Sequence, residues 1–110
     1  MIESRLVGSV TVLQVQGKLT LESGLRRAIH TAFESGSASI VLNLKEVSGI
    51  DSSGLAELLF CEMTATRRGG RVVICSPSPR AHAVIVVTQL HTIFNVYVTE
   101  DQALASVQPI

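Results

Sequence analysis

The chain has 110 residues, which suits one compact domain and leaves little room for a second, so we expect a single domain over residues 1–110. Nine basic residues balance nine acidic ones, which argues against nucleic-acid binding and gives no electrostatic case for an anionic membrane. Hydrophobic residues make up 46% of the chain but aromatic residues only 4%, so the core must be built from Val, Leu, Ile and Ala.

Two short strands and a helix are predicted for the first third of the chain. Ile2–Leu6 and Val10–Gln16 have strand composition, and the short turn around Gly8 between them predicts an antiparallel hairpin. Gly17–Thr20 is expected to be a loop that ends in a helix N-cap, since threonine is favoured at that position. A helix should follow and end at Gly36, because apolar residues recur at helical spacing. They are Leu21, Leu25, Ala28, Ile29, Ala32 and Phe33.

A strand, a helix and a second strand are predicted for the middle of the chain. Ser39–Leu44 is apolar at nearly every position, which is typical of a strand covered on both faces. A helix should run from about Ser53 to Arg67, and Arg71–Cys75 should form the next strand. The inward face of that helix is expected to comprise Leu55, Leu58, Leu59 and Met63.

The last third contains one ambiguous segment, Ala81–Leu90. Its valines have strand propensity, whereas the preceding Ser78-Pro79 pair and the need for a crossover favour a helix. Asn95–Val98 is predicted as a strand, and Thr99–Gln102 has the form of a capping box that opens a final helix.

The predicted order of elements is β-β-α-β-α-β-α-β-α. Strands that alternate with helices imply crossover connections and parallel pairing. We therefore expect an α/β fold with a mixed, mostly parallel sheet and an N-terminal antiparallel hairpin.

The cysteines and the N-terminus bear on the protein's compartment. Cys61 and Cys75 lie in apolar patterns without a C-x-x-C pair, so buried reduced thiols are expected rather than a disulfide. No charged and then apolar leader follows Met1, and the longest apolar run is far shorter than the ~20 residues of a membrane helix. A cytoplasmic protein without direct membrane insertion is expected, although docking on a membrane complex stays possible.

The most informative stretch is Asp51-Ser52-Ser53-Gly54-Leu55, where a buried strand gives way to a helix. A helix N-terminus has free backbone N–H groups and a positive dipole, which suits an anion such as a phosphate. A serine at this position can be a simple helix cap or the site of a covalent switch. The residue chemistry alone leaves both interpretations open.

Enzymatic patterns fail at the same stretch. A nucleophile elbow has the pattern G-x-S-x-G, with a glycine two residues before the serine, and Ile50 stands at that position before Ser52. Gly49 and Gly54 have the spacing of a phosphate-binding loop, but Leu55 and Ala56 replace its lysine and hydroxyl residue. The three histidines lie in unrelated segments and have no metal-ligand spacing. We therefore expect no catalysis, no metal site and no cofactor.

These residues resemble a known family. The run from Ile40 through Leu44 to Gly49–Leu55 is similar to the signature of the STAS domain, the fold of bacterial anti-sigma-factor antagonists. Gly69–Ile74, Ser76–Arg80, Phe94–Tyr97 and Thr99–Leu104 also match, so the resemblance covers essentially the whole chain.

The resemblance implies a mechanism based on binding. Members of this family bind an anti-sigma factor that is also a serine kinase, and they thereby free a sigma factor. The kinase phosphorylates the serine after the aspartate, here Ser52, and a metal-dependent serine phosphatase restores the active form. Partner binding is implied for Asp51, Ser53, Gly54, Leu55, Gly17, Lys18 and Thr20.

The chain departs from the family pattern at several positions. Lys18 and Thr20 stand where acidic residues are frequent, and Ala56 and Gln89 stand where glycines are frequent. Lys18 reverses the usual charge, which bears on the choice of kinase. An alternative function is a constitutive scaffold subunit of a transporter or signalling complex, in which Ser52 only caps the helix. The sequence leaves the oligomeric state open.

Overall fold

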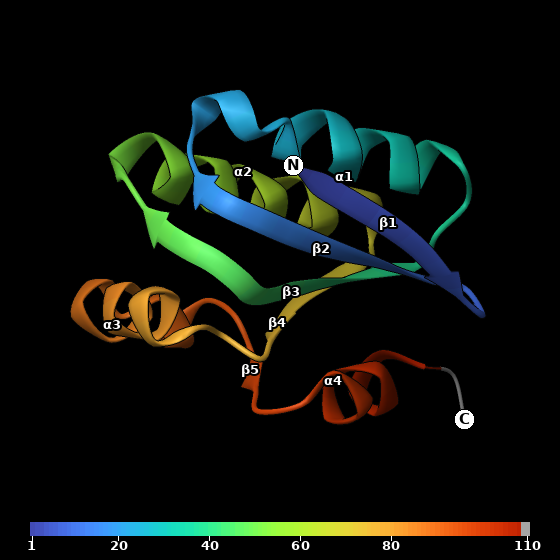
Figure 1. Ribbon diagram of the computed structural model, residues 1–110. Coiled ribbons are helices and arrows are strands. Elements are labelled where there is room, and N and C mark those ends of the chain that lie inside the picture. The colour runs from blue at the N-terminus through green and yellow to red at the C-terminus, as the bar shows by residue number, and fades with distance from the viewer. Residues whose placement is uncertain (109–110) are drawn as a thin grey trace.

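Five strands form one mixed sheet in the computed structural model, which describes residues 1–108 (Figure 1). The strands are β1 (Ile2–Val7), β2 (Val10–Leu19), β3 (Ser39–Ile50), β4 (Arg71–Cys75) and β5 (Val96–Tyr97). They lie side by side in sequence order; β1 pairs antiparallel with β2, and all other pairs are parallel. The predicted α/β fold with a parallel sheet and an N-terminal hairpin is therefore confirmed. The last two residues of the predicted 1–110 domain lie outside the described part.

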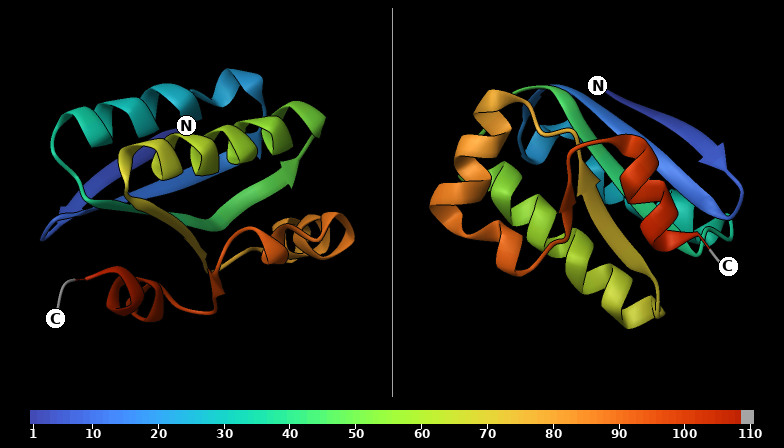
Figure 2. Two further views of the ribbon diagram at one scale, coloured as in Figure 1. Left: turned by 180° about the vertical axis from the view of Figure 1, so that it is seen from behind. Right: turned by 90° about the horizontal axis from the view of Figure 1, so that it is seen from below.

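Helices cover both faces of this sheet (Figure 2). They are α1 (Leu25–Glu34), α2 (Ser52–Arg68), α3 (Pro79–Thr88) and α4 (Glu100–Val107). The main apolar core joins α1, α2 and α3 to one face of the sheet, while a smaller valine-rich cluster joins α4 to the other face. Within residues 1–108, no helix combines the length and the apolar character needed to cross a bilayer.

The strands β2 and β3 run further than the sequence indicated. β2 continues to Leu19 and β3 to Ile50, and these two residues are partners in the ladder. The predicted loop over Gly17–Thr20 is therefore wrong for its first three residues, which lie on β2. Register shifts on either side of Gly17, whose φ is +82°, disrupt the alternation of the strand and hide it from pattern analysis.

The first helix starts later than predicted. Thr20 is a helix cap as expected, but it caps a short 3₁₀ turn, Leu21–Ser23. Gly24 then takes a left-handed conformation with φ of +84°, which ends that turn, so α1 begins only at Leu25. Leu21 is accordingly exposed and does not join the apolar face of the helix.

The inward face of α2 also differs from the prediction. Leu58 is buried and Leu55 packs against the core, but Leu59 and Met63 are 37% and 55% exposed. The buried face instead consists of Gly54, Glu57, Leu58, Cys61 and Ala65. Small side chains let the helix lie close to its neighbours, and a hydrophobic count alone misses a face built from them.

The ambiguous segment is the helix α3. Ser78 caps it by accepting a hydrogen bond from the Ala81 amide at 3.1 Å, and Pro79 occupies the first helical position. Capping and the crossover between β4 and β5 therefore outweigh the strand propensity of the valines. The predicted capping box of α4, formed by Thr99 and Gln102, is confirmed.

A helix end occupied by glutamine provides a stability prediction. Gln89 follows α3 in a left-handed conformation with φ of +59°, which favours glycine. We expect Gln89→Gly to stabilise the fold by about 1 kcal/mol, because relief of the backbone strain outweighs the added freedom of the unfolded chain. Urea denaturation measures this change. A lower midpoint for Gln89→Gly than for the unsubstituted protein would contradict it.

The two cysteines are buried free thiols, as predicted. Burial raises the pKa of Cys61 to about 12 and that of Cys75 to about 11. Both side chains therefore stay protonated at neutral pH and behave as small apolar residues.

Candidate functional site

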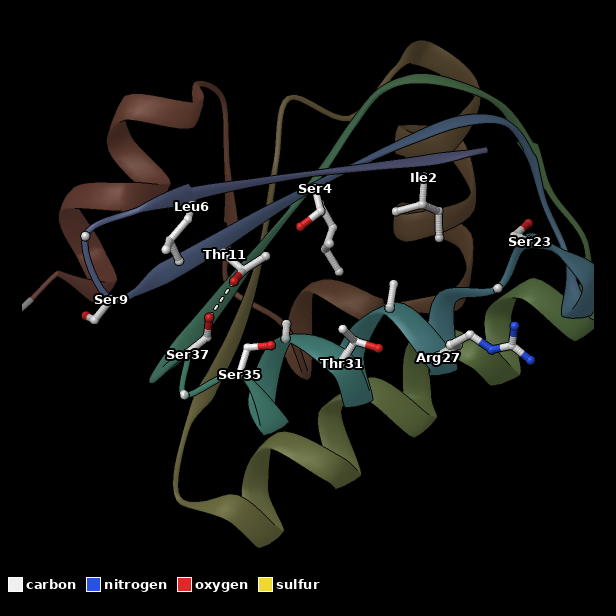
Figure 3. Close-up of a pocket in the computed structure, with 16 residues that line it drawn as sticks. Ile2, Ser4, Leu6, Ser9, Thr11, Ser23, Arg27, Thr31, Ser35 and Ser37 are labelled. Carbon is white, nitrogen blue, oxygen red and sulfur yellow. Dashed lines mark hydrogen bonds between the residues drawn. The ribbon is translucent and has the colours of Figure 1, made fainter.

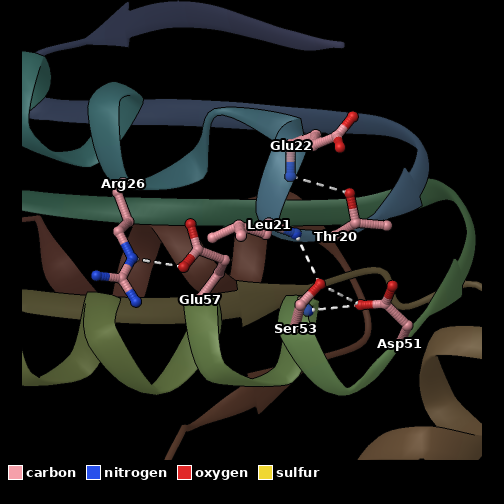
Figure 4. Close-up of polar contacts among 8 residues, drawn as sticks. Thr20, Leu21, Glu22, Arg26, Asp51, Ser53 and Glu57 are labelled. Carbon is pink, nitrogen blue, oxygen red and sulfur yellow. Dashed lines mark hydrogen bonds and ion pairs between the residues drawn. The ribbon is translucent and has the colours of Figure 1, made fainter.

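The candidate site lies where β2 and β3 end and α2 begins (Figure 4). The parallel ladder pairs Lys18 with Gly49 and Leu19 with Ile50, and the Asp51 amide donates to the Leu19 carbonyl at 3.3 Å. The structure thus brings all the predicted site residues, from both segments, to one edge of the sheet.

Asp51 is the cap of α2. Its Oδ1 accepts hydrogen bonds from the Gly54 amide at 2.8 Å and from the Ser53 hydroxyl at 2.7 Å. These hydrogen bonds, led by that from Ser53, favour the charged carboxylate and lower the pKa of Asp51, and the charge of Lys18 acts in the same direction. The helix start therefore carries a fixed negative charge at neutral pH.

Ser53 connects the helix start to the chain that follows β2. Its Oγ donates to Asp51 and accepts from the Leu21 amide at 2.8 Å (Figure 4). On the other side of this contact, Thr20 and Ser23 form a reciprocal capping box, and the Ser23 hydroxyl donates to the Lys18 carbonyl. Hydrogen bonds thus hold the two predicted partner-binding segments in one arrangement.

Ser52 differs from both of its neighbours. It occupies the first position of α2 and is exposed to solvent. Among residues 1–108, no group donates to or accepts from its hydroxyl. Capping is therefore performed by Asp51, and the Ser52 hydroxyl remains accessible.

Gly54 is buried and serves a packing role. A Cβ built on it would lie 2.1 Å from the Leu19 carbonyl oxygen, which is far inside van der Waals contact. Only glycine therefore allows α2 to lie this close to the end of β2. Leu55, the next residue, packs against the core. Gly54 therefore has no side chain to offer a partner, and the Leu55 side chain is partly buried.

An ion pair that the sequence analysis missed braces α1 against α2. Glu57 is 1% exposed, and the Arg26 guanidinium contacts its carboxylate at 2.5 Å (Figure 4). The same guanidinium lies 4.1 Å from the ring centroid of Phe60. No spacing in the sequence signals this contact, because its partners lie on different helices.

A separate groove of about 630 Å³ lies between β1 and α1 (Figure 3). Hydroxyl residues such as Ser4, Thr31 and Ser35 line it together with small and apolar side chains. None of the predicted site residues borders this groove, so it is not part of the candidate site.

The hydrogen bond from Ser53 to Asp51 leads to a testable prediction for the pKa of the Asp51 carboxyl group. Ser53→Ala removes the main cause of the lowered value, so the pKa of Asp51 should rise toward that of an ordinary aspartate. A carboxyl group whose pKa is lowered in the folded state stabilises the fold at pH values above its unfolded-state pKa. This contribution to stability is lost as the pH falls through the folded-state pKa. The variant should therefore lose this contribution at neutral pH. An NMR titration of the Asp51 carboxyl carbon measures the shift.

Ser52→Ala is the matched control, because the hydrogen bonds to the Asp51 carboxylate come from Ser53 and Gly54 and not from the Ser52 hydroxyl. The Asp51 titration should be the same in this variant as in the unsubstituted protein. Equal midpoints in Ser53→Ala and the unsubstituted protein would contradict the assigned contact.

The chain is similar to several known proteins. The family model of the STAS domain matches residues 1–103. An anti-sigma F factor antagonist of Paenibacillus polymyxa is 31% identical over 71 residues, which span 64% of this chain and 61% of that protein. A Thermotoga neapolitana protein, whose name places it among the anti-sigma factor antagonists, is 28% identical over 111 residues and 98% of both chains.

Two of the similar solved structures are of SpoIIAA, one in its unphosphorylated and one in its phosphorylated form. The anti-sigma factor antagonist SpoIIAA in its unphosphorylated form has a TM-score of 0.79 at 23% identity, covering 100% of this chain and 98% of its own. The phosphorylated form of SpoIIAA, from Bacillus, has a TM-score of 0.73 at 25% identity, covering 98% and 100%. The family match over residues 1–103 and the shared fold show that this chain belongs to the STAS domain family.

Proposed function

We propose that this protein is an anti-sigma-factor antagonist. It binds an anti-sigma factor that is also a serine kinase, and this binding releases a sigma factor. The kinase phosphorylates Ser52, which ends the interaction, and a serine phosphatase restores the active form. The names of the Paenibacillus and Thermotoga relatives support this assignment. In this account the protein acts by binding, not by catalysis, and needs no cofactor.

The observation that carries the proposal is the free hydroxyl of Ser52. A serine that served only as a cap would be engaged with the backbone of its own helix. Here Asp51 performs that task and Ser53 bridges to the neighbouring segment, while Ser52 is exposed. A kinase can therefore reach the Ser52 hydroxyl without unfolding the helix start.

The physics of this position suits a switch that leaves the fold intact. A phosphate adds about 1.5 to 2 negative charges at neutral pH. The dipole and amides at the start of α2 tolerate that charge, so the domain stays folded. A partner packed over the helix start would have to desolvate the phosphate beside the carboxylate of Asp51, which disfavours binding. The similarity to the phosphorylated form of SpoIIAA, at a TM-score of 0.73, supports the proposal that this fold stays intact after phosphorylation.

The partner surface extends to the segment after β2 in this proposal. Lys18 is exposed and Thr20 is half-buried, and both lie beside the helix start. Gly17 and Gly54 act through the backbone geometry that they permit, whereas Ser53 and Leu55 hold the helix start in place. The positive charge of Lys18 favours an acidic group on the kinase at this point.

A two-bait capture from native lysate tests the proposed function. The baits are the unsubstituted protein and Ser52→Asp, and bound proteins are identified by mass spectrometry. The expected result is an ATP-binding serine kinase on the unsubstituted bait alone. Identical partners on both baits, in particular transporter subunits, would overturn the switch and favour a constitutive scaffold.

A further inference from the structure

The solvent face of α2 carries an apolar stripe that starts at Ser52. Ala56, Leu59 and Met63 follow Ser52 at i+4, i+7 and i+11, so all four residues lie on one face of the helix. We call Ala56, Leu59 and Met63 the α2 stripe. All three are exposed, and they lie opposite the buried face of the helix.

The composition of the α2 stripe is unusual for this position. A surface helix normally presents polar residues on the face opposite its core. Single exposed apolar residues are common and need no explanation. Leu59 and Met63, however, are two large side chains one turn apart, in line with the residue at which the proposed switch acts. Within residues 1–108, Leu59 keeps 37% and Met63 keeps 55% of its surface open to solvent.

We propose that the α2 stripe is the docking surface for the kinase that phosphorylates Ser52. This inference rests on the proposed function and adds the surface by which the partner holds the chain. With a rise of about 1.5 Å per residue, Leu59 lies about 10 Å and Met63 about 16 Å from Ser52 along the helix axis. A specific interface buries about 800 Å² on each partner, which is a patch about 30 Å across. A patch of this size centred on the Ser52 hydroxyl extends about 15 Å from it, so the kinase covers Ala56 and Leu59 and reaches Met63 at the rim of the contact.

Geometry favours the kinase over a second copy of this chain. A second copy on the α2 stripe would also cover Ser52, because the stripe is continuous with it, and would block phosphate transfer. The kinase must approach this same face to react, so one contact surface serves both binding and positioning. Apolar contacts of this kind exclude water and provide affinity that does not depend on the charge at Ser52.

Calorimetric titration with the isolated kinase captured by the unsubstituted bait tests the docking surface. The test variants are Met63→Ser and the double variant Leu59→Ser/Met63→Ser. The control is Leu6→Ser, whose residue is 69% exposed on the edge strand β1 and is part of neither α2 nor the segment after β2. Thermal melting confirms that all variants are folded.

The double variant should raise the Kd for the kinase by about tenfold or more, with a smaller rise for Met63→Ser and none for Leu6→Ser. With ATP present, the KM for phosphorylation of Ser52 should rise while kcat is unchanged.

Unchanged affinity in folded stripe variants would overturn the docking surface and leave the proposed function standing. Failure of the unsubstituted bait to capture a serine kinase, or of the isolated kinase to bind the unsubstituted protein directly, would overturn both. A dimer of the unsubstituted protein that the double variant dissociates would assign the stripe to a second copy and overturn the inference.

Discussion

Gly54→Ala should destabilise the fold by about 3 kcal/mol or more. The added Cβ would lie 2.1 Å from the oxygen and 2.7 Å from the carbon of the Leu19 carbonyl. These are backbone atoms at the end of a central strand, so they cannot move aside without breaking the β2–β3 ladder. Alanine has a better helix propensity than glycine by about 1 kcal/mol, which is smaller than the cost of the clash.

Gly49→Ala is the matched control, because a Cβ at Gly49 meets no atom within 4 Å. Its stability should stay within about 0.5 kcal/mol of that of the unsubstituted protein. Urea denaturation followed by circular dichroism measures both variants. Equal midpoints for Gly54→Ala and Gly49→Ala would contradict the close approach of α2 to β2.

Ser52→Asp should weaken binding of the isolated kinase by about a hundredfold while the domain stays folded. The new carboxylate lies next to Asp51 at the exposed start of α2, where the helix dipole stabilises it. The partner, in contrast, would have to desolvate two adjacent negative charges on contact. The effect should therefore be seen in the Kd and be absent from the melting temperature.

Thr66→Asp separates charge from position. Thr66 is exposed on the same helix, near its other end, so this variant adds the same charge away from the helix start. Its Kd for the kinase should change much less than that of Ser52→Asp. Similar losses in both variants would indicate a general charge effect and contradict a switch located at Ser52.

Hydrophobic patterns predicted the fold well in segments where the backbone keeps one regular repeat of strand or helix from end to end. The hairpin, the buried part of β3 and the capped start of α4 follow from alternation, apolar runs and capping residues. The patterns failed where the backbone departs from regular geometry. The shifts around Gly17 concealed the end of β2, and the left-handed Gly24 separated a 3₁₀ turn from α1.

The candidate site was partly predictable for a related reason. The sequence identified the crowded polar residues at Asp51–Ser53 but could not tell which of them caps the helix. That distinction depends on the contact of Ser53 with the Leu21 amide, 32 residues away in the chain. The exposed positions of Leu59 and Met63 were hidden in the same way, because the buried face on the opposite side of α2 contains one leucine beside small residues and the charged Glu57.

Phosphate transfer from ATP by the captured kinase tests the central claim most directly. The unsubstituted protein, Ser52→Ala and Ser53→Ala are each incubated with the kinase and ATP, and intact mass and peptide mapping locate the phosphate. One phosphate on Ser52 is expected in the unsubstituted protein and in Ser53→Ala, with none in Ser52→Ala. A phosphate on Ser53, or phosphorylation of Ser52→Ala to the same extent as the unsubstituted protein, would contradict the account.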